Sequence, residues 1–284
     1  MKTFASALLF AAASAVPTAI FHGLGDACIY PGMKSFTNQI AEQTGDYAHC
    51  IEVGNGSLTS FFMNFEHQAE IACENLVANG NFDGEFNVVG LSQGGLLARY
   101  IVESCPMKGY VRNLLSIGGP QMGVSDVPEC FNGELCRLIN LTVRNLAYYK
   151  TFQDHIGPAG YFRDPHHMKE YLADSVFLPY LNNEDGTADA LASNKARFTA
   201  LNGVMLTMFT EDTVVYPKES EWFQELNELM KVEPLEKSAF YQSDLIGLKQ
   251  LNEAGKVQFV SIVGDHLEFT DADTTNIFVP FLLS

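Results

Sequence analysis

Residues 86–95 read Phe-Asn-Val-Val-Gly-Leu-Ser-Gln-Gly-Gly, a pattern typical of a strand, a tight turn and the start of a helix. The apolar run over 86–91 predicts a buried β-strand, and residues 95–104 predict a helix directly after it. The turn between them carries the pattern G-x-S-x-G, in which small residues on either side of the serine let strand and helix approach closely. The sequence therefore predicts a nucleophile elbow with Ser92 at its tip, in preference to a surface serine in a glycine-rich turn.

Strand and helix signals alternate along the chain on both sides of this turn. Short apolar runs predict further strands at 18–21, 114–117, 204–209 and 257–263. Apolar residues at helical spacing predict one amphipathic helix over 61–77. This alternation is typical of an α/β fold with a mostly parallel central sheet that helices cover on both faces.

The segment from about residue 121 to residue 202 contains no clear strand signal. It is rich in aromatic residues, which are Tyr148, Tyr149, Phe152, Tyr161, Phe162, Tyr171, Phe177 and Tyr180. We interpret it as a helical, loop-rich insertion between two strands of the core. It fits two roles, either helices packed on the sheet or a cap that lines an apolar substrate groove, and composition does not separate them.

Candidate partners for Ser92 follow two of the predicted strands. A serine becomes a strong nucleophile only when a base takes its proton and an acid orients that base. In α/β-hydrolases both partners follow the serine in the chain, in the order acid and then histidine. Asp212 comes after the strand 204–209, and His266 comes after the strand 257–263. The order and position predict Ser92, Asp212 and His266 as a catalytic triad.

Two other carboxylates compete with Asp212 for the role of acid. Glu211 is its neighbour in the chain, and Asp265 directly precedes His266. Asp265 is too close along the chain to orient the adjacent ring comfortably. A side chain on the loop past the strand reaches the imidazole Nδ1–H, and this favours Asp212.

The fold also predicts two donors for the oxyanion that forms during acyl transfer. One is the backbone N–H after the nucleophile, and the other comes from the loop after an early strand. These positions are Gln93 and Leu24. In the preceding His22-Gly23 pair, the backbone can turn so that the Leu24 amide points at the substrate. A plain tight turn is the alternative interpretation of this segment.

Charge and composition exclude several classes of partner. The chain has 284 residues, with 17 basic and 34 acidic side chains and a formal net charge of −17. Nucleic acids and anionic membranes attract basic surfaces, so we expect neither as a partner. No stretch after the N-terminal region approaches the roughly 18 uncharged apolar residues of a membrane span. No cysteine has zinc-binding spacing, and the pair His166-His167 is more typical of a solvated surface, so we expect no metal and no cofactor.

The N-terminal region has the features of a secretory signal peptide. Lys2 precedes an uncharged run over 4–13, and Ala13-Ser14-Ala15 supplies the small residues that signal peptidase requires. We expect residues 1–15 to be removed, leaving an α/β-hydrolase domain over 16–284.

The cysteines and sequons fit the same secretory route. Six cysteines are typical of an oxidising compartment, although the sequence leaves their pairing open. Asn55 and Asn140 begin Asn-x-Ser/Thr sequons and are candidate glycosylation sites.

Together these motifs resemble the palmitoyl-protein thioesterase family of lysosomal α/β-hydrolases. The resemblance extends from about residue 20 to residue 283. The segments that carry it are F-H-G-L-G-D-A-C at 21–28, V-G-L-S-Q-G-G at 89–95, S-I-G-G-P-Q-M-G-V at 116–124, E-D-T-V-V-Y-P-K-E-S-E-W-F at 211–223, Y-Q-S-D-L-I-G-L-K at 241–249 and G-D-H-L at 264–267.

The resemblance implies Ser92 as nucleophile, Asp212 as acid and His266 as base, with Leu24 and Gln93 as oxyanion donors. It further implies the disulfides Cys73–Cys105 and Cys130–Cys136, and it leaves Cys28 with Cys50. Some relatives carry two adjacent cysteines after the His-Gly turn, whereas Ile29 follows Cys28 here. The loop before Asp212 contains no sequon, so we expect no glycan there.

The activity implied by the resemblance is removal of long-chain (palmitoyl) groups from S-acylated cysteines of proteins or peptides, through an acyl-serine intermediate. Palmitoyl-CoA is a further candidate substrate, the insertion is the expected acyl-chain groove, and the expected location is lysosomal or secreted. A lipase or carboxylesterase acting on oxyesters uses the same triad and is the first alternative. A non-catalytic secreted lipid-binding protein is the second, and the intact triad argues against it.

Overall fold

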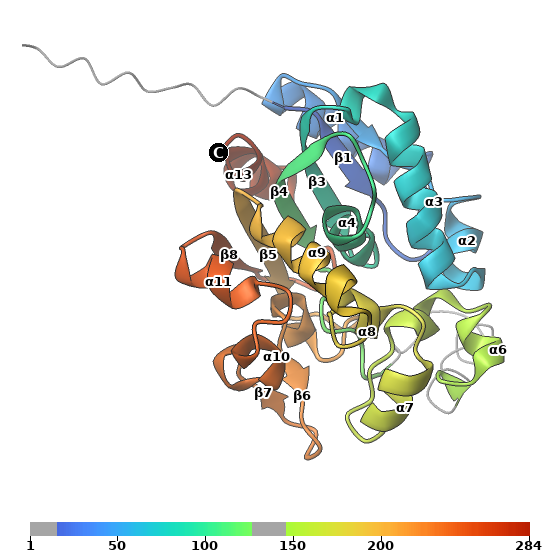
Figure 1. Cartoon of the computed structure of the whole chain (residues 1–284). Coiled ribbons are helices and arrows are strands. Elements are labelled where there is room, and N and C mark those ends of the chain that lie inside the picture. The colour runs from blue at the N-terminus through green and yellow to red at the C-terminus, as the bar shows by residue number, and fades with distance from the viewer. Residues whose placement is uncertain (1–15, 127–145) are drawn as a thin grey trace, which may run out of the picture.

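A parallel β-sheet forms the centre of the molecule (Figure 1). The computed structural model describes residues 16–126 and 146–284, so the predicted signal peptide, the Cys130–Cys136 pair and Asn140 lie outside the described residues. The strands are β1 (Thr18–Phe21), β2 (Ala48–Cys50), β3 (Glu85–Leu91), β4 (Tyr110–Ile117), β5 (Gly203–Phe209) and β8 (Val257–Ile262). They lie in the order β2-β1-β3-β4-β5-β8, and each neighbouring pair is parallel. The predicted α/β class with a mostly parallel sheet is confirmed.

Each face of the sheet has its own hydrophobic core. Successive side chains of a strand point to opposite faces, so Val88 and Leu114 enter one core while Val89 and Leu115 enter the other. Burial on both faces explains why the strands read as nearly continuous apolar runs. The first core is covered by α3 (Phe65–Ala78), α4 (Gly94–Glu103), α9 (Ala188–Thr199) and α11 (Leu248–Glu253), and the second by α1 (Pro31–Thr44) and α13 (Val279–Leu282).

The expected single helix over 61–77 is wrong, because the chain forms two helices there. Helix α2 (Ser57–Phe62) ends at Met63, whose backbone is extended, and α3 begins after Asn64. The Asn64 side chain accepts a hydrogen bond from the His67 N–H at 3.0 Å and so caps the first turn of α3. An asparagine that bonds the backbone in this way starts a new helix more readily than it continues an old one.

The described part of the insertion consists of short helices at one end of the sheet (Figure 1). They are α6 (Lys150–Gln153), the 3₁₀ turn η2 (Gly157–Tyr161), α7 (Met168–Asp174) and α8 (Leu178–Leu181), followed by α9. Several of the aromatic side chains pack inward. Phe65 of α3 makes edge-to-face contacts with Tyr161 at 5.1 Å and with Phe177 at 4.6 Å between ring centroids. These rings therefore fasten the insertion to the core.

A second long connecting segment, after the insertion between β4 and β5, joins β5 to β8. It contains the 3₁₀ turns η3 (Lys218–Trp222) and η4 (Leu235–Lys237), the antiparallel pair β6 (Glu225–Leu226) and β7 (Val232–Glu233), and α10 (Ala239–Gln242) before α11. The chain then ends in α12 (Asp271–Asp273), the π-helical turn η5 (Thr274–Phe278) and α13.

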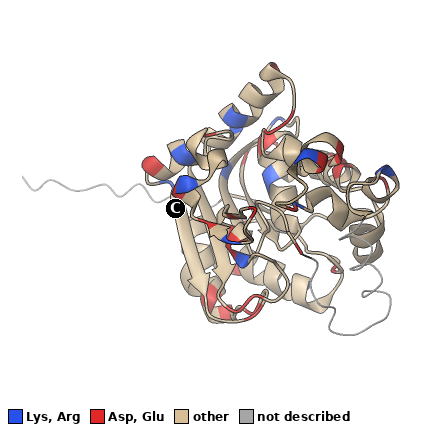
Figure 2. Cartoon of the chain, turned by 90° about the horizontal axis from the view of Figure 1, so that it is seen from below, with Lys and Arg blue, Asp and Glu red and all other residues tan. Residues whose placement is uncertain are grey.

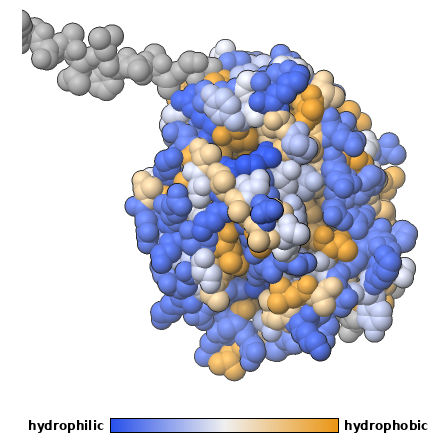
Figure 3. Space-filling view, in the orientation of Figure 1, coloured by the Kyte–Doolittle hydropathy of each residue, from blue (hydrophilic) through white to orange (hydrophobic). Residues whose placement is uncertain are grey.

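The surface carries both signs of charge and separate apolar patches. Lys and Arg positions are dispersed over several helices and loops of the ribbon in Figure 2. Polar residues cover most of the face in Figure 3, and apolar patches interrupt them. Within the described ranges, no helix combines the length and the apolar character needed to span a bilayer.

Candidate active site

Ser92 occupies a strained turn between β3 and α4. Its φ of 53° lies in the left-handed region, which is uncommon for a residue other than glycine. The surrounding glycines are required by close backbone approach, because a Cβ on Gly90 would lie 2.2 Å from the Gly94 carbonyl oxygen. A Cβ on Gly94 would lie 2.2 Å from the carbonyl oxygen of Phe21 in the neighbouring strand. The elbow geometry expected from the G-x-S-x-G pattern is therefore present.

Ser92, His266 and Asp212 form one continuous hydrogen-bonded chain. His266 Nε2 lies 2.8 Å from Ser92 Oγ, and His266 Nδ1 lies 2.5 Å from Asp212 Oδ2. Strands β5 and β8 are parallel neighbours, so the loops after them bring the acid and the base to the same edge of the sheet. The His266 side chain is 9% exposed and that of Asp212 is fully buried, so the acid is screened from solvent more completely than the base.

Asp212 is held as an anion in a fixed orientation. Its Oδ1 accepts hydrogen bonds from the Val214 and Val215 N–H groups, both at 2.7 Å. Burial acts to raise the pKa of Asp212, but the hydrogen bond and the charge of the His266 imidazole and the bond from the Val215 amide bring that pKa below its ordinary value. An ionised Asp212 is the state that orients a histidine base.

The two competing carboxylates do not contact the imidazole ring. Asp265 Oδ1 accepts the backbone N–H of His266 at 2.7 Å and that of Thr213 at 2.9 Å, so this residue ties the two catalytic loops together. The bond from His266 and the bonds from Thr213 lower the pKa of Asp265. Glu211 is exposed, and its backbone N–H bonds the Gly264 carbonyl. Neither acid takes the position that Asp212 occupies.

The loop with Leu24 lies against the nucleophile. A Cβ on Gly23 would be 3.0 Å from the Ser92 Cβ, so the adjacent amide belongs to the immediate surroundings of the serine. Within the described residues, neither the Leu24 N–H nor the Gln93 N–H donates to a protein acceptor. Two unpaired amides beside a nucleophile are what an oxyanion hole requires.

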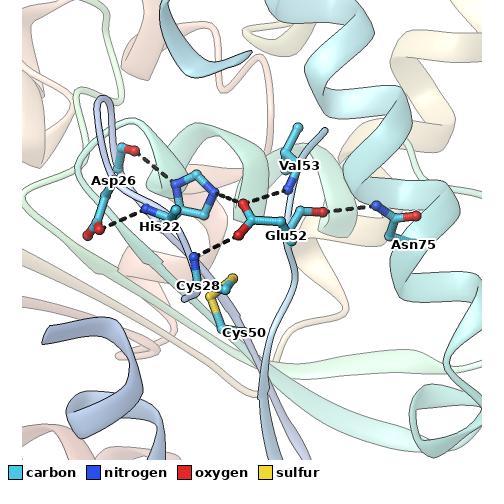
Figure 4. Close-up of a disulfide and its surroundings, with 9 residues drawn as sticks. His22, Asp26, Cys28, Cys50, Glu52, Val53 and Asn75 are labelled. Atoms are coloured by element: carbon cyan, nitrogen blue, oxygen red, sulfur yellow. Dashed lines mark hydrogen bonds and ion pairs between the residues drawn. A yellow bond between two sulfur atoms is a disulfide. The ribbon is translucent and has the colours of Figure 1, made fainter. Parts of the chain in front are cut away.

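A network around Glu52 fixes this loop in place (Figure 4). Buried His22 lies with Nε2 2.8 Å from Glu52 Oε1 and with Nδ1 3.0 Å from the Gly23 carbonyl oxygen. Glu52 Oε2 accepts the Cys28 N–H at 2.8 Å, and a disulfide joins Cys28 to Cys50 at the end of β2. Both ends of the loop are therefore attached to the segment that follows β2.

If Leu24 is the oxyanion donor that the sequence predicts, we expect Glu52→Gln to lower kcat/KM by about tenfold, with less change in KM, because a displaced Leu24 amide would stabilise the oxyanion less well. An amide has one acceptor oxygen, so it cannot serve all of the donors that the two carboxylate oxygens now serve. The measurement is steady-state thioester hydrolysis. The matched control is Glu42→Gln on the exposed side of α1. A Glu52→Gln variant with wild-type kcat and only a lower melting temperature would assign this network to stability alone.

The side chain of Gln93 connects the elbow to the insertion. Tyr161 donates its hydroxyl to Gln93 Oε1 at 2.9 Å, and Gln93 Nε2 donates to Gln68 Oε1 of α3 at 3.2 Å. All three side chains are buried, and burial raises the pKa of Tyr161. The insertion therefore bonds directly to the residue that follows the nucleophile.

The sequence did not assign a role at this site to Glu52, Tyr161 or Glu221. No pattern marks Glu52, which lies in a segment far from Ser92. Tyr161 belongs to the aromatic-rich segment and Glu221 to the motif at 211–223, but neither pattern places the side chain beside the triad. Glu221 is fully buried, and its Oε1 lies 4.0 Å from His266 Nδ1. Only the tertiary contacts reveal that these side chains surround the triad.

Two clusters place potential metal ligands within 4.8 Å of one another. In the first, formed by His22, Cys28 and Glu52, the cysteine sulfur is already used in a disulfide. In the second, formed by Asp212, Glu221 and His266, the imidazole Nδ1 is bonded to Asp212. Neither arrangement offers a free set of ligands.

The other residues that the sequence analysis singled out take no part in the hydrogen-bonded chain of Ser92, His266 and Asp212. A second disulfide joins Cys73 of α3 to Cys105, just after α4. Asn55 is exposed in the loop before α2, as a glycosylated residue must be. His166 and His167 are both more than half exposed and lie beside Asp164, with His167 Nδ1 2.8 Å from Asp164 Oδ2.

Known proteins are similar to this chain over much of its length. Residues 17–266 match the family model described as palmitoyl protein thioesterase. The chain is 31% identical to Palmitoyl-protein thioesterase 1 of Caenorhabditis elegans, over 89% of this chain and 87% of that protein. It is 30% identical to Palmitoyl-protein thioesterase 3 of Dictyostelium discoideum, over 97% of this chain and 96% of that protein. It is also 30% identical to Lysosomal thioesterase PPT2-B of Xenopus laevis, over 66% of this chain and 64% of that protein.

Proposed function

This chain belongs to the palmitoyl protein thioesterase family, and from that premise we propose that Ser92, Asp212 and His266 catalyse the removal of fatty acyl groups from S-acylated cysteines. The protein is a hydrolase that acts on thioesters. The observation that supports the assignment of residues is the hydrogen-bonded chain at 2.8 Å and 2.5 Å, in a segment that matches the family over 17–266.

The first half of the reaction transfers the acyl group to the enzyme. His266 Nε2 takes the proton from Ser92 Oγ as this oxygen attacks the thioester carbonyl carbon, and Asp212 stabilises the imidazolium that forms. The amides of Leu24 and Gln93 donate to the oxyanion. When the tetrahedral intermediate collapses, the C–S bond breaks, and the departing cysteine sulfur receives the proton from the imidazolium.

The second half returns the enzyme to its starting state. A water molecule loses a proton to His266 and attacks the acyl-serine carbonyl through the same oxyanion site. The C–O bond to Ser92 then breaks, Ser92 regains its proton from the imidazolium, and the fatty acid is released. A thiolate leaves more easily than an alkoxide, so acylation by a thioester depends less on proton donation by His266.

We assign the acyl chain to a groove between the core and the insertion over residues 121–202. The bond from Tyr161 to Gln93 supports this assignment, because it attaches the insertion beside the reacting carbonyl. A groove for a long acyl chain next to the nucleophile suits S-palmitoylated proteins or peptides, and it suits palmitoyl-CoA equally.

We further propose that the enzyme works in the lysosome after entry into the secretory route. The relative from Xenopus laevis is named a lysosomal thioesterase. The two disulfides are typical of proteins that fold in an oxidising compartment. Removal of residues 1–15 as a signal peptide stays part of this proposal.

The experiment that tests the substrate class compares an S-palmitoyl cysteine peptide with the O-palmitoyl serine peptide of the same sequence. Released thiol and free palmitate are measured with purified protein at equal substrate concentration. We expect rapid cleavage of the thioester and much slower cleavage of the oxyester. Equal or faster oxyester cleavage would place the protein with lipases and carboxylesterases. Binding of palmitate without cleavage of either substrate would support a lipid-binding role instead.

A further inference from the structure

A second buried carboxyl group lies behind the triad. Glu221 belongs to η3, and its side chain is fully excluded from solvent. Its Oε1 is 4.0 Å from His266 Nδ1, the nitrogen that bonds Asp212. Ligand atoms of Glu221, Asp212 and His266 all lie within 4.8 Å of one another. A mechanism with one acid and one base leaves this third group without a role.

The hydrogen bonds of Glu221 indicate which oxygen carries a proton. Oε2 accepts the Phe209 N–H at 3.0 Å. Oε1 is buried and has no donor at hydrogen-bonding distance among the described residues. A carboxylate oxygen that is buried without a donor is strongly disfavoured, whereas a protonated oxygen can act as the donor itself.

The charges around Glu221 favour the same state. Asp212 reaches it from the loop after β5 and His266 from the loop after β8, while Glu219 lies on the same turn. Lys218 of that turn donates to the Thr210 carbonyl oxygen. Burial, then the hydrogen bond and the negative charge of Asp212, raise the pKa of Glu221 to about 11, against the lowering effect of the Phe209 amide.

We propose that Glu221 is a positioning residue that stays protonated and donates a hydrogen bond to Asp212, so that this pair of carboxyls holds one negative charge. This inference rests on the proposed triad. Together with the observed bonds from the Val214 and Val215 amides, this proposed bond orients Asp212 toward His266. A second negative charge beside the ring would favour the imidazolium over the neutral imidazole that must accept the proton of Ser92.

The first test measures the proton itself. Between about pH 5.5 and 7.5 an unfolded glutamate is ionised, whereas folded Glu221 keeps its proton, so folding binds about one extra proton at this residue. The unfolding free energy therefore contains a contribution that falls as pH rises in this window. In Glu221→Gln this contribution is absent. The slope of the unfolding free energy against pH measures the difference in bound protons between the unfolded and folded states, and we expect this slope to become less negative by the equivalent of about one proton. An unchanged slope means that folded Glu221 is ionised and overturns the proposal.

The second test measures catalysis over the same pH range. Glutamine keeps the shape of the side chain, an oxygen that accepts the Phe209 N–H and an N–H group that donates to Asp212. We therefore expect kcat/KM of Glu221→Gln to stay within about threefold of wild type. We also expect the acid limb, which is the fall of kcat/KM at low pH, to stay at the same pH. Glu221→Leu removes the donor and is expected to lose about tenfold to a hundredfold. Glu236→Gln, at an exposed position of η4, is the matched control. An acid limb displaced to lower pH in Glu221→Gln would show that the charge of Glu221 normally acts on His266, which contradicts the proposal.

These measurements separate the inference from the assignment of substrate. The stability slope needs no substrate, and labelling of Ser92 by a fluorophosphonate reports the nucleophile without a thioester. Wild-type protein could fail to cleave the thioester while the slope of the unfolding free energy against pH differs between wild type and Glu221→Gln as expected. In that case the proposed function is wrong and the role of Glu221 stands. If Glu221→Leu does not fold, Glu221→Gln alone tests whether Glu221 is protonated. The two measurements are then the pH dependence of its unfolding free energy and the fall of its kcat/KM at low pH.

Discussion

Ser92→Ala is expected to lower kcat for thioester hydrolysis by roughly 10⁵- to 10⁶-fold while the protein remains folded. The alanine side chain has no hydroxyl oxygen, so the acyl-enzyme cannot form and His266 has no hydroxyl proton to accept. The Ser92 hydroxyl bonds only His266 among the described side chains, so its removal leaves no other buried partner unsatisfied. Serine and alanine have a similar energetic cost of adopting the φ of 53° at position 92, so the backbone conformation is expected to stay the same.

The measurement is release of thiol from an S-palmitoyl peptide, together with fluorophosphonate labelling and thermal denaturation. Labelling is expected to disappear, and the melting temperature is expected to stay close to that of wild type. Ser261→Ala on the exposed side of β8 is the matched control and should retain full activity. Activity of Ser92→Ala within tenfold of wild type would assign the nucleophile to another residue.

Asp212→Asn is expected to lower kcat by about 10⁴-fold. Oδ1 of Asp212 accepts two backbone N–H groups, so the oxygen of an asparagine must remain at that position. The NH₂ group is then directed at His266 Nδ1, which must accept instead of donate. The imidazole proton moves to Nε2, and His266 can no longer take the proton of Ser92.

Two rival carboxylates provide the controls for this prediction. Glu211→Gln changes an exposed side chain and should leave kcat near its wild-type value. Asp265→Asn weakens the bonds from the His266 and Thr213 amides that join the loops, so we expect less than about tenfold loss. A larger loss in Asp265→Asn than in Asp212→Asn would reverse the assignment of the acid.

Secondary structure was predictable where one local pattern decided it. The strands β1, β3, β4, β5 and β8 overlap with the predicted apolar runs. Strands β1, β3 and β5 are buried along almost their whole length, and such parallel strands must be mostly apolar. Strand β8 lies at the edge of the sheet and has exposed Gln258 and Ser261 between its apolar residues. Helix α1 was not predicted, although Pro31 begins it and Gly45 ends it with a φ of 72°. The break before α3 was missed because helical periodicity continues through a capping residue, Asn64. A cap depends on one hydrogen bond, which periodicity does not record.

The identity of the candidate triad was contained in the order of the chain. Ser92 lies at a turn that only small neighbours permit, and Asp212 and His266 follow two of the predicted strands. In a parallel sheet all strand ends of one kind meet at the same edge, so linear order is enough to bring such residues together. The sequence also left Asp212, Glu211 and Asp265 as competing acids, and only side-chain geometry showed which one contacts the ring.

The α/β architecture, the elbow and the candidate nucleophile and base could all be predicted from the amino-acid sequence, because each depends on local pattern and chain order. The surroundings of the triad depend on tertiary contacts instead. Glu52, Tyr161 and Glu221 reach it from separate segments, and each acts through a contact between residues distant in the chain. Burial and the approach of a second charge control the protonation of a carboxyl group, and both arise only when the chain has folded.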